Sequence, residues 1–136
     1  DRSYEQFLVS DFLPFQAGIE AGAPAILISH NIVRCMDEQY PASLSKKAHD
    51  VLREDLGFEG IIMTDDLAMD AVSSYSGSKS SAVLAVLAGN DLLISSDLPS
   101  QYRSVLEAVE QGEISQQMLD RAVLRVLRWK ESLGLL

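Results

Sequence analysis

The chain has 136 residues, 47% of them hydrophobic and 23% charged, with a formal net charge of −9. This balance is typical of one ordinary globular domain and excludes a disordered chain. The acidic charge and the lack of any basic cluster argue against nucleic acid as a partner. No apolar run approaches the ~20 residues that a membrane span requires.

The first predicted helix covers residues 11–21. Asp11 is expected to cap its start, and Pro14 falls in its first turn, where the missing N–H of proline costs no hydrogen bond. An apolar strip along this helix is formed by Phe12, Phe15 and Ile19. The pattern predicts a helix that packs against a core through one side.

Three short apolar runs follow a common plan, at residues 25–28, 61–63 and 92–94. Each run comes shortly after a glycine, is apolar on both faces, and ends in polar residues. Such runs are typical of buried strands in a parallel sheet. A predicted helix lies between each run and the next, which supplies the crossover connections that parallel strands need.

The remaining helices carry clear start and stop signals. Ser45 is expected to cap a helix that ends at Gly57, and His49 is expected to lie on the solvated surface of that helix. Further helices are predicted over residues 80–88, 102–109 and 115–133. This alternation predicts an α/β fold of about three parallel βα units, either part of a (β/α)₈ barrel or part of an open doubly wound sheet.

Polar residues follow each predicted strand and are expected to meet at one edge of the sheet, where ligands bind in both architectures. They are Ser29-His30, Thr64-Asp65-Asp66 and Ser95-Ser96-Asp97. Two adjacent carboxylates directly after a buried strand are costly unless they are solvated, paired or used. Position alone leaves two interpretations of the Asp65-Asp66 pair: a reacting carboxylate, or a cap for a short helical turn over residues 67–71.

Other arrangements at this edge have less support. No recognised ligand spacing favours a metal site built from Asp65, Asp66, Asp70 and His30. No GxSxG turn accompanies a triad of Ser29, His30 and Asp97. Cys35 has no evident histidine partner, and His30 fits hydrogen-bonded packing as well as catalysis. Met69 is open to two interpretations, a pocket lining or ordinary core.

Several stretches of the sequence belong to one known pattern. Two of them read Asp11-Phe12-Leu13-Pro14-Phe15 and Ile28-Ser29-His30-Asn31-Ile32, and a third has the spacing Asp37, Pro41-Ala42 and Ser45. The fourth, residues 56–69, reads L-G-F-E-G-I-I-M-T-D-D-L-A-M. Together they resemble glycoside hydrolase family 3, most closely its β-N-acetylhexosaminidase branch, and residues 56–69 resemble its nucleophile motif.

The resemblance implies that Asp65 is the catalytic nucleophile, that Met69 lines the sugar subsite, and that His30 stands nearby at the rim. It implies that residues 1–136 are the C-terminal part of the family's N-terminal barrel domain, a partial (β/α)₈ barrel of the TIM type without cofactor or metal. The implied activity is retaining hydrolysis of O-glycosidic bonds through a covalent glycosyl-enzyme. The implied substrate is a glycan ending in β-N-acetylglucosamine or a related sugar.

One departure from the family limits the implied activity. The family's K-H-F-P-G-H-G segment and its His-containing acid/base loop are absent from these 136 residues. General acid/base help is worth about 10²–10⁴-fold, so the chain alone is expected to be inactive. The alternatives are a non-catalytic half-barrel for binding or assembly, an open α/β binder of small molecules, and a β-glucosidase-like member, whose branch tends to place Trp where Asp66 stands. Open strand edges also predict self-association.

Overall fold

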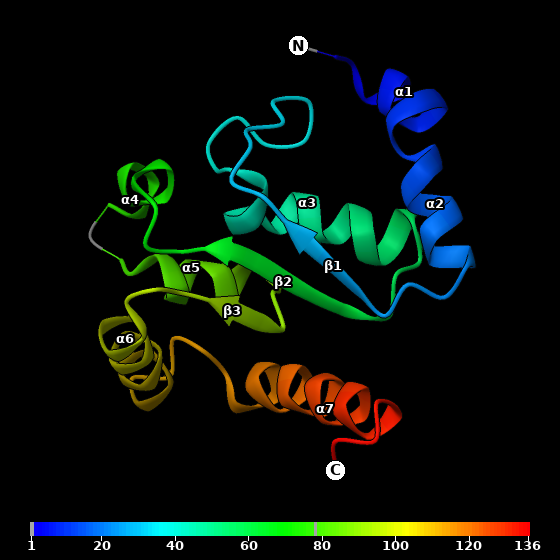
Figure 1. Cartoon of the computed structure of the whole chain (residues 1–136). Coiled ribbons are helices and arrows are strands. Elements are labelled where there is room, and N and C mark those ends of the chain that lie inside the picture. The colour runs from blue at the N-terminus through cyan, green and yellow to red at the C-terminus, as the bar shows by residue number, and fades with distance from the viewer. Residues whose placement is uncertain (1, 78) are drawn as a thin grey trace.

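A computed structural model describes residues 2–77 and 79–136. In this part of the chain, one parallel sheet has the order β1-β2-β3, with β2 in the middle (Figure 1). The strands are β1 (Ala25–Ile28), β2 (Ile61–Asp66) and β3 (Leu92–Ile94). The predicted α/β class and the predicted strands are therefore confirmed, although β2 continues beyond residue 63 to Asp66.

Helices connect the strands and flank the sheet. They are α1 (Tyr4–Gln6), α2 (Leu13–Glu20), α3 (Lys46–Asp50), α4 (Asp70–Ser76), α5 (Ser81–Ala88), α6 (Leu98–Glu110) and α7 (Gln116–Ser132). Wider π-type turns extend α1 and α3 over Phe7–Asp11 and Val51–Asp55. The cap predicted at Ser45 is confirmed, and Ser115 caps α7 in the same way, since each hydroxyl accepts a backbone N–H at the helix start. None of the described helices combines the length and the hydropathy needed to cross a lipid bilayer.

The start of α2 differs from the prediction. Asp11 does not cap this helix, because its carboxylate pairs with Arg2 at 2.6 Å and the residue at the cap position is Phe12. Pro14 does lie in the first turn. The prediction was wrong because helical structure already begins after Ser3, which caps α1, so that Asp11 falls within a continuing helical segment.

The core lies between the sheet and the helices α3 and α5, which cover the same face of it (Figure 1). β2 is the most deeply buried strand because it has a neighbour on each side, and Ile62 and Thr64 are fully buried there. Side chains alternate along β1, where Ile28 is buried against the helices and Leu27 is exposed on the opposite face. Gly60 is required before β2, since a Cβ there would lie 2.5 Å from a backbone carbonyl oxygen.

The pairing of β2 with β3 is irregular at the end that carries the acidic pair. Met63 pairs with Leu92 and Asp66 pairs with Ile94, so three steps along β2 face two steps along β3. The Thr64 hydroxyl accepts the N–H of Ile94 at 3.0 Å, in place of a regular ladder bond. This irregularity has the character of a β-bulge, a feature that often lies beside active sites and redirects side chains.

The prediction that His49 lies on a solvated surface is wrong, because only 2% of this residue is exposed. The turn that closes α5 covers it: Gly89 adopts a φ of +117°, and a Cβ added there would lie 3.6 Å from His49. Burial lowers the pKa of the imidazole, and its Nδ1 donates to the carbonyl of Ser45 at 2.8 Å. His49 therefore belongs to the packing between α3 and α5.

We expect the isolated 136-residue chain to self-associate. In the described part of the chain, β1 and β3 form the outer edges of the sheet. Large apolar side chains are exposed on the sheet and on α7, among them Leu27, Ile94, Val123 and Leu127. Unpaired strand edges and apolar surface both favour association. Sedimentation velocity at micromolar concentration should detect dimers or larger species, and a single monomeric species that unfolds cooperatively would contradict this expectation.

Candidate active site

The polar residues that follow the strands gather at one edge of the sheet, as the sequence predicts. His30 follows β1, Asp66 ends β2, and Ser96 follows β3. Nε2 of His30 lies 3.0 Å from the carbonyl oxygen of Asp66, and the N–H of Ser96 donates to Oδ1 of Asp66 at 2.9 Å. Asp66 therefore links the ends of β1, β2 and β3.

The carboxylate of Asp66 is held by backbone N–H groups. Its Oδ1 accepts from Ala68 and from Ser96, each at 2.9 Å. These hydrogen bonds, that of Ala68 first, lower the pKa of Asp66 below its ordinary value, so the group is ionised at neutral pH. Asp66 thus holds the turn directly after β2. The predicted helical turn over residues 67–71 is not formed, because α4 begins only at Asp70 and has no side-chain cap.

The carboxylate of Asp65 has fewer contacts within the protein. Asp65 is half-buried, and its Oδ1 accepts the backbone N–H of Asp66 at 2.8 Å. Among the described residues, no cation forms an ion pair with it. The second oxygen therefore remains available to a ligand, on a side chain fixed by a buried strand.

His30 is engaged through both ring nitrogens. A carbonyl oxygen can only accept, so the Nε2 that faces Asp66 carries a proton. Nδ1 lies 2.7 Å from the hydroxyl of Ser43, which donates to it when the ring is neutral. Both contacts are within the protein, so the triad considered for Ser29, His30 and Asp97 is not formed.

Met69 lies on the surface beside Asp66. It is 44% exposed, and its N–H donates to the Asp66 carbonyl at 3.2 Å. The interpretation of Met69 as ordinary core is therefore wrong, and lining of a pocket at this edge stays a prediction. Within residues 2–77 and 79–136, no three His, Cys, Asp or Glu side chains are arranged to hold a metal ion.

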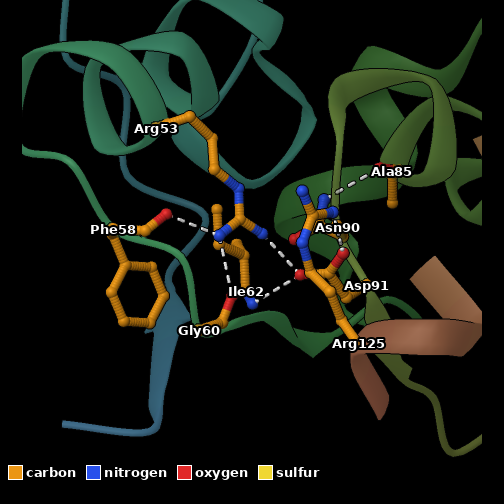
Figure 2. A network of polar contacts seen from close by, with 8 residues as sticks. All are labelled: Arg53, Phe58, Gly60, Ile62, Ala85, Asn90, Asp91 and Arg125. Atoms are coloured by element: carbon orange, nitrogen blue, oxygen red, sulfur yellow. Dashed lines mark hydrogen bonds and ion pairs between the residues drawn. The ribbon is translucent and has the colours of Figure 1, made fainter. Parts of the chain in front are cut away.

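A second polar network, which the sequence analysis missed, lies at the amino ends of the strands (Figure 2). Asp91 precedes β3, and only 1% of its side chain is exposed. Its carboxylate accepts from Arg53 at 2.5 Å, from Arg125 at 3.0 Å and from the N–H of Ile62 at 3.0 Å. Arg53 also donates to the carbonyls that precede β2, those of Phe58 and Gly60.

This network ties the helices to the amino ends of the strands. Burial lowers the pKa of the Arg53 guanidinium, while the charge of Asp91 opposes that shift. A cavity of about 720 Å³ opens beside the network at Pro24, Arg53 and Trp129. Ligands of parallel α/β folds bind at the carboxyl ends of the strands, so the ends that carry Asp65 are the candidate active site, and this network has a structural role.

Comparison with known proteins points to one family. Residues 1–129 match the sequence model of the glycosyl hydrolase family 3 N-terminal domain. A β-hexosaminidase from Nitrosomonas eutropha is 30% identical over 131 residues, which are 96% of this chain and 37% of that protein. The chain thus spans little more than a third of the length of this curated relative.

Solved structures of the same kind share the fold. A family 3 β-N-acetylglucosaminidase from Paenibacillus sp. superposes with a TM-score of 0.87 at 34% identity, over 96% of this chain and 26% of that chain. The β-glucoside phosphorylase BglX superposes with a TM-score of 0.89 at 26% identity, over 99% of this chain and 26% of that chain. The prediction of a partial barrel of the TIM type is thereby confirmed, because these neighbours are barrel domains.

Proposed function

Because the chain belongs to glycoside hydrolase family 3 and is similar to its β-hexosaminidases, we propose that it carries the nucleophile of a retaining β-N-acetylhexosaminidase. The nucleophile is Asp65. The observation that carries this assignment is the unequal number of contacts within the acidic pair. The carboxylate of Asp66 accepts from the N–H of Ala68 and from both the N–H and the side chain of Ser96, whereas that of Asp65 accepts from the N–H of Asp66 alone among the described residues.

The chemistry requires little movement of Asp65. One of its oxygens attacks the anomeric carbon and forms a C–O bond as the bond to the leaving oxygen breaks. The leaving oxygen takes a proton from a general acid, and water then hydrolyses the glycosyl-enzyme. A short side chain at the end of a buried strand supports this attack because its position is fixed before the substrate arrives. Met69 and His30 would contact or shape the sugar site.

We place the general acid outside this chain. The 136 residues have neither the K-H-F-P-G-H-G segment nor the His-containing loop of the family. We therefore assign residues 1–136 to the C-terminal part of a family 3 barrel domain, which other residues of the full-length protein complete. The share of the Nitrosomonas relative that the chain spans, 37%, supports this assignment.

The 136-residue chain alone should have negligible activity, whereas the full-length protein should hydrolyse aryl β-N-acetylglucosaminides. Loss of the acid alone lowers the rate by about 10²–10⁴-fold, and the missing sugar contacts lower it further. Release of the aryl group should be measured for both proteins, with an Asp65→Ala chain as the blank. Turnover by the short chain near the 1–10³ s⁻¹ of ordinary enzymes would contradict the assignment of the acid.

A glucoside-acting member of the family is the second candidate, since BglX is described as a β-glucoside phosphorylase. Here Asp66 and Leu67 follow the nucleophile, without the Trp that the glucosidase branch tends to have. Parallel assays of aryl glucoside and aryl N-acetylglucosaminide, each with and without inorganic phosphate, separate the candidates. A full-length protein that cleaves neither substrate would instead favour a non-catalytic half-barrel for binding or assembly.

A further inference from the structure

A chain of hydrogen bonds runs behind the candidate active site and begins at the start of β3. Nδ2 of Asn90 donates to the carbonyl of Ser43 at 2.8 Å, and the hydroxyl of Ser43 lies 2.7 Å from Nδ1 of His30. Nε2 of His30 then donates to the carbonyl of Asp66 at 3.0 Å.

Ser43 is held so that its hydroxyl has one direction. It is completely buried, in a short helical turn over Ala42–Leu44. Its N–H donates to the carbonyl of Ser29 at 3.3 Å, and its carbonyl accepts from Asn90. The backbone of Ser43 is thus fixed from two other segments, and its hydroxyl is fixed toward His30.

The far end of this chain reaches the nucleophile through one residue. The carbonyl of Asp66 accepts from His30, and the N–H of Asp66 donates to Oδ1 of Asp65 at 2.8 Å. The peptide groups of Asp66 therefore join the orientation of the imidazole to the orientation of the reacting carboxylate.

We propose that Ser43 is a positioning residue, which holds the His30 ring and, through the backbone of Asp66, the carboxylate of Asp65. The proposal rests on the nucleophilic role of Asp65 proposed above. Without the hydroxyl, Nδ1 of His30 loses its hydrogen-bond donor. Rotation of the ring, which lets Nδ1 form a hydrogen bond with water, then becomes favourable. The bond from Nε2 to Asp66 is then lost, and Asp65 is no longer confined to its productive position.

The Ser43→Ala variant of the full-length protein tests this. A mechanism-based fluorosugar, whose C1–F bond breaks as Asp65 bonds to C1, reports the first chemical step directly. Labelling of Asp65 should slow about ten- to a hundredfold, because a displacement near 1 Å costs that much. The loss should appear in the rate constant of labelling at saturation, with little change in the half-saturating concentration of the fluorosugar.

Ser45→Ala is the matched control. Ser45 is equally buried two residues away, but its hydroxyl donates to Asp37 and caps α3. This variant should lose stability while it keeps the labelling rate. A double-mutant cycle with His30→Gln separates positioning from general damage: if Ser43 acts through His30, Ser43→Ala should change the labelling rate little in the His30→Gln background.

Nitrogen NMR of the wild-type histidines gives an independent reading. His30, identified by loss of its signals in His30→Gln, should carry its proton on Nε2 when neutral. A neutral Nδ1–H tautomer in the wild type would overturn the role of Ser43. Full additivity of the effects of Ser43→Ala and His30→Gln on the labelling rate would also overturn it. If the wild type itself is not labelled at Asp65, the proposed function has failed. Normal labelling of the wild type with additive variants means that only the positioning role has failed.

Discussion

Asp65→Ala should lower turnover of the full-length protein by at least about 10⁴-fold, the loss expected when a covalent catalyst is removed. Asp66 cannot replace it, because backbone N–H groups of Ala68 and Ser96 hold that carboxylate at the turn after β2. Release of an aryl group from N-acetylglucosaminide measures the rate. Mass spectrometry after treatment with the fluorosugar should find the label on the peptide that contains Asp65.

The matched variant is Asp66→Asn, which keeps an oxygen to accept from Ala68 and Ser96 but removes the charge. Its activity should fall far less than that of Asp65→Ala, since the turn it caps survives. A label on Asp66, or a near-normal rate for Asp65→Ala, would show that the two carboxylates have been assigned the wrong way round.

Asp91→Ala should destabilise the full-length protein by about 3–5 kcal/mol, the usual loss when one partner of a buried ion pair is removed. The Asp91 side chain is 1% exposed, and that of Arg53 is 19% exposed. The substitution leaves the Arg53 charge in the interior without its carboxylate, and it also removes the acceptor of the Ile62 N–H. The midpoint of urea unfolding should fall, with an unchanged slope.

Asp50→Ala provides the comparison for that loss. Asp50 pairs with Lys46 at 2.6 Å, but the side chains are 41% and 70% exposed. Exposed pairs contribute about 0–1 kcal/mol to stability, so Asp50→Ala should lower the free energy of unfolding by no more than that. Equal losses for the two variants would mean that the ion pairs of Asp91 contribute no more to stability than an exposed pair.

Much of the sheet follows from local sequence. The runs at 25–28, 61–63 and 92–94 are apolar on both faces, a pattern typical of strands in a parallel sheet, and a glycine comes shortly before each. The end of β2 was harder to predict. Residues 64–66 are polar, and they extend the strand because Thr64 and Asp66 form tertiary hydrogen bonds with Ile94 and Ser96, which lie about thirty residues later in the sequence.

Burial of polar side chains was the least predictable part. His49 has the helical position of a surface residue, and its burial depends on the turn at Gly89, which has no side chain to keep the two segments apart. Arg53 and Asp91 are separated by 38 residues, so no short motif joins them. The available signal was Asn90-Asp91, two polar residues that stand after Gly89 and directly before an apolar strand.

The acidic edge itself was predictable, but the separate tasks of its two carboxylates were not. Adjacent aspartates after a strand suggest either capping or chemistry, and the sequence does not say which residue does which. The distinction depends on the N–H groups of Ala68 and Ser96, whose directions follow from tertiary structure.

The irregular pairing of β2 and β3 also restricts how this region can change in length. One extra residue of β2 lies between the pairs Met63–Leu92 and Asp66–Ile94. Deleting a residue there would make the two strands regular, but it would shift every later side chain by one position and turn the acidic pair to other faces. Insertions and deletions between 63 and 66 should therefore be far less tolerated than substitutions.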